Sequence, residues 1–266
     1  MPAEQEVGYP SVDGVTLRAT WHPADGEAAV VMAHGITGER DEGGLFSEMA
    51  ERLGAVGVSS LRFDFRAHGA SGGAQEEMTV NGEIMDFAAS LAWLSRQRPA
   101  RPAFVAASFG AVSVCQMARL FRDLPALVLL NPVLDPRRTF LEPETDWPRA
   151  SFNSAGFAHL EEHGFLWLDG RFKIGRQLAH DLGIYRPYER FQGMRAPVLI
   201  IHGDADTCVP YAVSAEAAQA NPNIELVTVP GADHGFGRPH ERQLVLDKTM
   251  EWLLPKLSRS LDRPRS

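Results

Sequence analysis

Short apolar runs alternate with amphipathic stretches along most of the chain. Runs rich in apolar and β-branched residues recur at 30–33, 59–65, 103–107, 126–130, 198–201 and 224–229. Several are apolar at successive rather than alternate positions, which is typical of strands covered on both faces, as in a parallel sheet. The pattern therefore predicts a buried and mostly parallel sheet.

The stretches between these runs have helical periodicity. Phe46, Met49, Ala50 and Leu53 fall at i, i+3, i+4 and i+7, and residues 84–94 repeat this spacing. Residues 111–121 are apolar nearly all round, and 244–254 form a last amphipathic segment. Strands that alternate with helices predict an α/β fold with a doubly wound parallel sheet and right-handed crossovers.

One connection is much longer than a crossover requires. Residues 132–195 span 64 positions between two predicted strands and hold ten of the chain's 23 aromatic residues. Disordered segments are poor in aromatics, so we expect an ordered insert, and such inserts are commonly lids or binding elements. The predicted organisation is a core of residues 1–131 and 196–257, a lid at 132–195 and a flexible polar tail at 258–266.

Composition and charge exclude several classes of protein. The 266 residues carry a net charge of −8, which argues against binding the phosphate backbone of a nucleic acid. Two cysteines imply no disulfide framework. The acidic N-terminus is unlike a signal peptide, and no apolar run approaches the roughly 18 residues of a membrane span. We therefore expect a cytoplasmic protein that binds neither nucleic acid nor membrane.

A serine stands where a buried strand runs into an apolar helix. Small residues, Ala106 and Gly110, flank Ser108 at −2 and +2. A nucleophile elbow needs this arrangement, because the tight turn lifts the hydroxyl above the sheet edge. The same turn aims the N–H of Phe109 at the place where an oxyanion would form. A strand-to-helix turn with a capping serine is the simpler alternative.

An acid and a base follow in the order that suits a hydrolase triad. Asp206 comes after the run at 198–201, and His234 lies in a glycine-bounded loop after the last run. The order Ser108, Asp206, His234 and their placement at carboxyl ends of strands predict a Ser-His-Asp site. Asp204, Asp233 and Asp135 are the competing acids, and the Gly-Asp-x-Asp spacing favours Asp206.

The loop after the run at 30–33 completes the predicted chemistry. In His34-Gly35-Ile36-Thr37-Gly38, Gly35 lets the backbone pass close to the serine, and the N–H of Ile36 is the second candidate oxyanion donor. A string at 159–163 matches a zinc-peptidase motif, H-x-x-E-H, but a solvated helix face explains it better. No phosphate-binding glycine motif is present, so we expect neither a metal nor a cofactor.

Together these segments resemble an α/β-hydrolase over roughly residues 7–257. The likeness is greatest to bacterial cinnamoyl/feruloyl esterases and related small acyl-ester and acyl-peptide hydrolases. It is carried by residues 34–38, 61–72, the elbow at Ser108, 202–206 and 232–234. The resemblance implies an α/β-hydrolase fold with a lid insert before the seventh strand. It also implies that Asp64, Arg66 and His68 are scaffold.

The predicted activity is that of a serine esterase working through an acyl-enzyme intermediate. His234 would take the proton of Ser108, Asp206 would orient the imidazole, and the insert would form an apolar acyl or aryl pocket. Trp147, Phe165 and Trp167 are its candidate substrate-binding residues. The alternatives are an acyl-peptide or thioester hydrolase, an acyl transferase or cyclase, and a non-catalytic binding module. The expected partner is a small acyl substrate, and a homodimer is left open.

Overall fold

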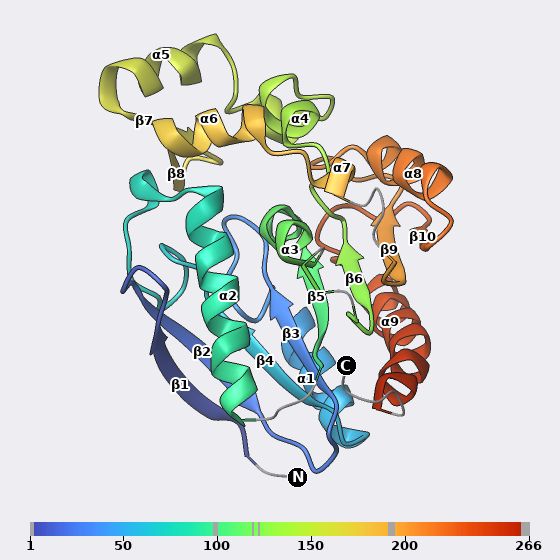
Figure 1. The fold of residues 1–266 in the computed structure, drawn as a ribbon. Coiled ribbons are helices and arrows are strands. Elements are labelled where there is room, and N and C mark those ends of the chain that lie inside the picture. Colours follow the sequence, from blue (N-terminus) through green and yellow to red (C-terminus); the bar gives the residue numbers. More distant parts are fainter. Residues whose placement is uncertain (1–2, 98–100, 119, 122, 191–194, 262–266) are drawn as a thin grey trace.

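The structure, a computed structural model, describes residues 3–97, 101–118, 120–121, 123–190 and 195–261. Within them one eight-stranded sheet has the order β1-β2-β4-β3-β5-β6-β9-β10 (Figure 1). All neighbours from β4 to β10 pair in parallel, whereas β2 is antiparallel to both β1 and β4. The strands are β1 (Gln5–Pro10), β2 (Thr16–His22), β3 (Ala29–Ala33), β4 (Ser59–Phe63), β5 (Ala103–Ala107), β6 (Leu127–Leu130), β9 (Val198–Gly203) and β10 (Ile224–Val229).

The N-terminal hairpin of β1 and β2 extends the sheet beyond the predicted strands. β1 is mostly exposed, so its residues form no continuous apolar run. In β2, Leu17, Ala19 and Trp21 alternate with other residues and turn toward the core. Thr20 and His22 on the other face are buried as well, so only the start of β2 has an open face. The hairpin covers one edge of the parallel strands (Figure 1), and Asp13 in its turn pairs with Arg66 in the loop that follows β4.

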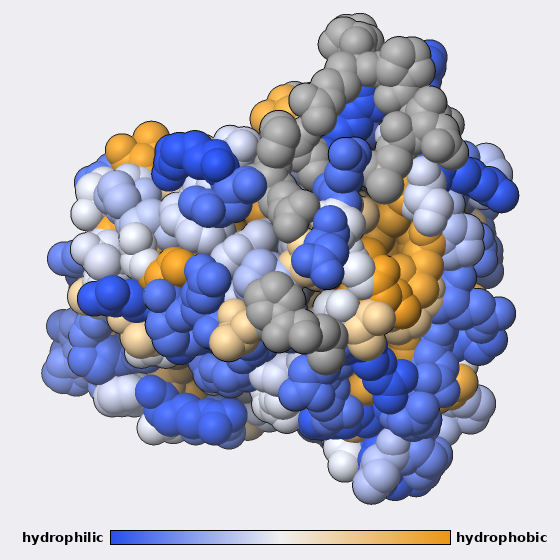
Figure 2. Space-filling model, turned by 90° about the horizontal axis from the view of Figure 1, so that it is seen from below, coloured by the Kyte–Doolittle hydropathy of each residue, from blue (hydrophilic) through white to orange (hydrophobic). Residues whose placement is uncertain are grey.

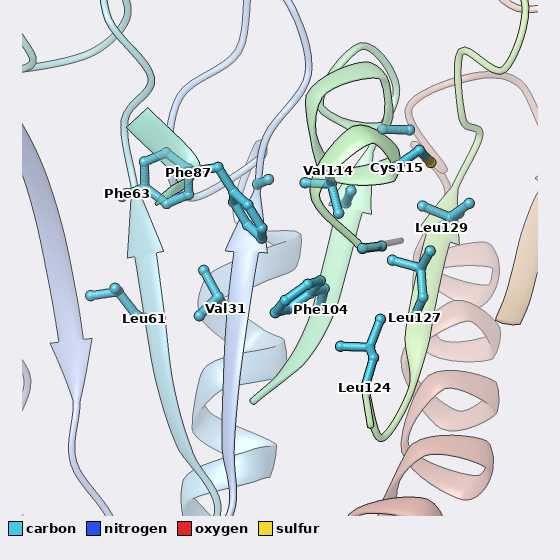
Figure 3. Close-up of a cluster of buried hydrophobic side chains, with 14 of the residues drawn as sticks. Val31, Leu61, Phe63, Phe87, Phe104, Val114, Cys115, Leu124, Leu127 and Leu129 are labelled. Atoms are coloured by element: carbon cyan, nitrogen blue, oxygen red, sulfur yellow. The ribbon is translucent and has the colours of Figure 1, made fainter. Parts of the chain in front are cut away.

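Helices cover both faces of the sheet, as doubly wound topology requires. On one face lie α2 (Val80–Gln97), α3 (Gly110–Ala118) and α8 (Tyr211–Ala220), and on the other lie α1 (Leu45–Ala55) and α9 (Pro239–Leu261). Figure 3 shows the first core, where Phe87 and Val114 meet Phe104 and Leu127 of the strands. Each fully buried side chain of this size contributes roughly 1.5–3 kcal/mol of hydrophobic free energy.

The connection between β6 and β9 is an ordered insert, and β9 is the seventh sheet strand in chain order. It contains a π-helical turn (Arg137–Leu141), α4 (Asp146–Arg149), α5 (Ser154–His163), β7 (Phe165–Leu168), β8 (Phe172–Gly175), α6 (Arg176–Ile184) and α7 (Pro187–Arg190). Most of these elements lie above the carboxyl ends of the strands (Figure 1). Phe191, one of its ten aromatics, falls outside the described residues.

The insert and the core share a third hydrophobic cluster. Phe140 and Phe152 of the insert pack there with Ile36, Phe109 and Val112 of the core. A buried carboxylate adds a polar tie, because Asp181 Oδ2 accepts a 2.9 Å hydrogen bond from Val80 N at the start of α2. The short η1 (Gln75–Glu77) also contacts β8. The insert therefore rests on the elements that surround Ser108.

The C-terminus differs in part from the sequence expectation. Helix α9 runs to Leu261, so residues 258–261 are helical rather than part of a tail, and 262–266 lie outside the described residues. Among the described helices, none is long and apolar enough to cross a membrane. Seen from the end opposite the insert, the surface is largely hydrophilic, with a connected apolar strip toward one edge (Figure 2).

Candidate active site

Ser108 occupies a strained turn between β5 and α3. Its φ of +48° is left-handed, a region that a non-glycine residue adopts at an energetic cost and that is enriched at functional sites. The turn fits because its neighbours are small. A Cβ on Gly110 would stand 2.4 Å from the carbonyl oxygen of His34, and one on Gly35 would stand 2.8 Å from Cβ of Ser108.

Three strand ends bring Ser108, His234 and Asp206 together. His234 Nε2 lies 2.9 Å from Ser108 Oγ, and His234 Nδ1 lies 2.7 Å from Asp206 Oδ2. Asn131, at the end of β6, supports this loop through a side-chain hydrogen bond to the carbonyl oxygen of His234. Asn131 Oδ1 in turn accepts a 3.0 Å hydrogen bond from Gly203 N. The three predicted residues thus form one continuous hydrogen-bonded chain.

Both oxygens of Asp206 are engaged. Oδ1 accepts hydrogen bonds from the N–H groups of Cys208 at 2.7 Å and Val209 at 2.8 Å. Oδ2 receives His234 and, at 3.1 Å, His202 Nε2. Burial would raise the pKa of Asp206, but the hydrogen bonds from the two histidines hold it well below the usual range for a carboxyl. The side chain is therefore a fixed anion.

His202 is a supporting residue to which the sequence analysis assigned no role. It is fully buried in β9, and its Nδ1 lies 2.7 Å from Ser214 Oγ. Nε2–H donates to Asp206, so Nδ1 carries no proton and accepts a hydrogen bond from the hydroxyl of Ser214. These two partners assign the tautomer of His202. The sequence signal is the spacing of His202 and Asp206, four residues apart across the end of a buried strand.

The three competing acids serve the backbone instead. Asp204 accepts from Gly231 N at 2.6 Å, and Asp233 Oδ1 accepts from Thr207 N at 2.9 Å and His234 N at 2.8 Å. Asp135 accepts from the N–H groups that begin the π-helical turn. Of the four acids, Asp206 alone has an oxygen against the imidazole of His234.

The environment of His234 favours its protonated form. Burial would lower the pKa of this imidazole, but the hydrogen bond and charge of Asp206 raise it above the ordinary histidine value. Glu42 and Asp233 add smaller contributions in the same direction. An imidazole whose pKa is raised in this way accepts a proton readily and is mostly neutral only above that pKa.

The two candidate oxyanion donors flank the serine. Among the described residues, no hydrogen bond engages the N–H of Ile36 or of Phe109. His34 holds the loop that carries Ile36: Nδ1 donates to Gly35 O at 2.8 Å, and Nε2 accepts from Phe65 N at 3.0 Å. Burial lowers the pKa of His34 to about 3, so this ring is neutral. Both N–H groups remain available to a bound oxygen.

A cavity of about 260 Å³ lies between Ser108 and the insert. Its walls combine core residues with Thr139, Phe140, Trp147 and Arg171 of the insert. Trp147 therefore reaches the predicted pocket. Phe165 and Trp167 do not line this cavity.

Phe165 and Trp167 lie on the small β7–β8 sheet instead. The ammonium of Lys173 stands 4.7 Å from the Phe165 ring centroid and 5.6 Å from that of Trp167, and Trp167 is 41% exposed. The sequence does not distinguish these two residues from Trp147. The face of β7 on which each side chain lies is known only once the bounds and register of the strand are known.

Comparisons with known proteins agree with this architecture. Residues 30–246 match the model of a family described as the alpha/beta hydrolase family. An uncharacterized protein of Mycobacterium tuberculosis is 30% identical over 261 residues, 95% of this chain and 80% of that protein. A monoacylglycerol lipase of Mycolicibacterium smegmatis is 26% identical over 288 residues, 95% of this chain and 98% of the lipase. Est1E from Butyrivibrio proteoclasticus, solved with ferulic acid bound, has a TM-score of 0.76 at 27% identity and covers 94% of this chain and 99% of its own.

These matches confirm the predicted fold class and the resemblance to esterases of this fold. The catalytic roles of Ser108, Asp206 and His234 stay predictions, which the distances among these side chains support, and the division of the chain into core, lid and tail stays a prediction as well.

Proposed function

Because the chain belongs to the alpha/beta hydrolase family and resembles an esterase and a lipase, we propose that it is a serine hydrolase of carboxylic esters. The observation that carries the proposal is the unbroken hydrogen-bonded chain from Ser108 through His234 to Asp206. A binding module on this scaffold would need neither a strained serine nor a histidine hydrogen-bonded between that serine and a buried carboxylate.

The proposed reaction passes through an acyl-enzyme. His234 Nε2 takes the proton of Ser108 as Oγ attacks the acyl carbon, and Asp206 stabilises the imidazolium. The C–O bond to the alcohol breaks, and the alcohol oxygen leaves with the proton from His234. A water then gives one proton to His234 and attacks the acyl carbon. The bond between that carbon and Ser108 Oγ breaks, His234 returns the proton to Oγ, and the acid leaves.

Charge that develops on the carbonyl oxygen needs donors that are already in place. The N–H groups of Ile36 and Phe109 are suited to this role, since both lie beside Ser108 and neither is used by the described residues. Loss of one such donor typically costs about 10²–10³ in kcat. The buried hydrogen bonds of His34 keep this loop in position without a proton transfer.

The acyl group that we propose is small and apolar or aromatic. Support comes from the cavity of about 260 Å³, where Ile36, Phe140 and Trp147 supply apolar walls next to Ser108. The ferulic acid bound to Est1E is an aromatic acid of this kind. The insert would act as the lid that shapes this pocket.

The same residues could act on a thioester or an acyl peptide, or transfer the acyl group to a nucleophile other than water. These alternatives use the same Ser108 chemistry and differ in the acceptor or the leaving group. Analysis of the products from matched ester, thioester and aminoacyl substrates separates them.

A fluorophosphonate probe tests the proposal. We expect the wild-type protein to be labelled and Ser108→Ala to remain unlabelled, with label mapped to the peptide that contains Ser108. Equal labelling of the two proteins, or a folded wild type that resists the probe, would contradict a serine hydrolase. Ser113→Ala is the matched control, because Ser113 is a buried serine of the following helix whose hydroxyl is bonded to Gly110 O.

A further inference from the structure

A second cavity opens at Ser108 and His234, and none of the insert residues that the structure describes lines it. Its volume is about 160 Å³, room for several waters at roughly 30 Å³ each. Its walls come from Glu42 after β3, Asn131 at the end of β6, Phe236 in the histidine loop and Arg242 of α9. The two cavities therefore share the reacting pair but differ in their walls.

Most polar groups on the walls of this second cavity already have partners. Asn131 bonds to His234 and Gly203 through its amide. Arg242 donates to Glu48 Oε1 and to Gly43 O, each at 2.8 Å.

Glu42 differs because half of its carboxylate is open. Oε2 accepts a 2.7 Å hydrogen bond from Gly35 N, whereas no hydrogen bond from a described residue reaches Oε1. Burial raises the pKa of Glu42, while the Gly35 hydrogen bond and the nearby His234 oppose that shift. The half-buried side chain thus offers one unused acceptor oxygen to the cavity beside the reacting serine.

An ester bound at Ser108 must send its acyl chain and its alcohol in different directions. The cavity under the insert offers the large apolar side chains of Phe140 and Trp147 to an acyl group, and this assignment leaves the second cavity for the alcohol. We propose that this cavity holds the leaving alcohol and that Glu42 accepts a hydrogen bond from a hydroxyl on it, so that esters of hydroxylated alcohols are preferred. A neutral hydroxyl suits the site better than an ammonium, because the Arg242 guanidinium lines the same cavity. This inference rests on the proposed ester hydrolysis.

Glu42 takes no proton in this scheme. The alcohol oxygen still receives its proton from His234 Nε2, and the bond that breaks is the one between that oxygen and the acyl carbon. Glu42 therefore binds the substrate, and its effect must depend on the leaving group rather than on the acyl group.

The test compares the 2-hydroxyethyl ester and the propyl ester of one acid, which have nearly the same shape. For the wild type we expect kcat/KM to favour the hydroxyethyl ester about tenfold to a hundredfold, the effect of one hydrogen bond to a charged group. Glu42→Gln keeps an acceptor for Gly35 N–H but turns toward the cavity an amide NH₂, which can donate only a neutral hydrogen bond to the hydroxyl oxygen, so the preference should fall to about twofold to tenfold. The 2-methoxyethyl ester, which cannot donate, should behave like the propyl ester with the wild type and gain on it with Glu42→Gln.

Glu39→Gln is the matched control. Glu39 lies in the same loop and its substitution removes the same charge, but it lines neither cavity and its carboxylate accepts from Asp41 N. Its ester preference should equal that of the wild type, which separates a local contact from a general change in charge.

Three results would overturn the inference. The first is a wild type that hydrolyses both esters equally. The second is a Glu42→Gln enzyme that loses the same factor on both esters, since Glu42 would then act only through the Gly35 loop or His234. The third is a preference that follows a hydroxyl on the acid instead of the alcohol. Failure of the proposed function is distinct: no ester at all would be hydrolysed in a Ser108-dependent way.

Discussion

The strand ends that carry Ser108, Asp206 and His234 differ in construction from the insert that lies over them. Each strand-end residue is held by backbone constraints: a left-handed turn at Ser108, two N–H donors on Asp206 and a carbonyl contact from Asn131 to His234. The insert is held largely by a shared hydrophobic cluster and a few polar ties. We therefore expect reactivity to depend on backbone geometry and substrate choice to depend on side chains that can be exchanged.

The largest effect should come from Ser108→Ala. Alanine tolerates the turn about as well as serine but cannot form an acyl-enzyme, so ester hydrolysis should fall by about 10⁴–10⁶. Steady-state kinetics and a thermal melt measure the activity and the fold. A folded variant that keeps most of its turnover would place the reactivity outside the strand ends.

Asp206→Asn should have the next largest effect. The amide can still contact His234 but favours the wrong tautomer, so kcat should fall by up to about 10⁴. Asp204→Asn, Asp233→Asn and Asp135→Asn are matched controls, because their carboxylates bind backbone N–H groups, and each should cost far less. If Asp135→Asn proves the most damaging, the acid comes from the end of β6 instead.

Trp147→Ala tests the insert side of the comparison. Because Trp147 lines the cavity over Ser108, its truncation should lower kcat/KM for an aromatic ester relative to an acetyl ester by about 1–3 kcal/mol. Trp167→Ala is the control, since this residue is 41% exposed and lies on the β7–β8 sheet. Equal changes for the two variants would mean that the insert supports the fold rather than recognition.

The pH profile should show the smallest effect. The raised pKa of His234 means that the imidazole is neutral above that pKa and loses its proton-accepting form as the pH falls through it. kcat/KM should therefore have an acidic limb above pH ~6.5, the ordinary histidine value. Glu42→Gln and Glu39→Gln can be measured in the same assay: the limb of Glu42→Gln should move to lower pH, because Glu42 contributes to the raised pKa. An unchanged limb would mean that Glu42 lies too far from the imidazole to affect it.

The contrast between the strand ends and the insert also explains which parts of the structure the sequence predicts. A serine between Ala106 and Gly110 at the end of a buried run can adopt few backbone conformations. His234, in the loop after the last run, is constrained in a similar way. The sheet from β3 to β10 was also predictable, since several of its strands, among them β3, β5 and β9, are largely continuous apolar runs. The N-terminal hairpin was not, because β1 is exposed.

Side-chain positions in the insert could not be predicted from composition. Trp147, Phe165 and Trp167 are equally apolar, yet they separate by element and register, which depend on packing in three dimensions. The sequence gives no role to His202 or Glu42 for a related reason. His202 contacts Ser214 and Asp206, and Glu42 contacts Gly35, and these contacts depend on the paths of the loops in three dimensions.

The most direct test of the account is to trap its acyl-enzyme. The protein is mixed with an excess of an activated aromatic ester, quenched in acid within milliseconds to seconds, and analysed as intact protein and as peptides. The account predicts an added mass equal to one acyl group on the peptide that contains Ser108, absent from Ser108→Ala and slow to clear in Asp206→Asn. Rapid turnover with no adduct at any quench time, or an adduct on another residue that survives Ser108→Ala, would contradict it.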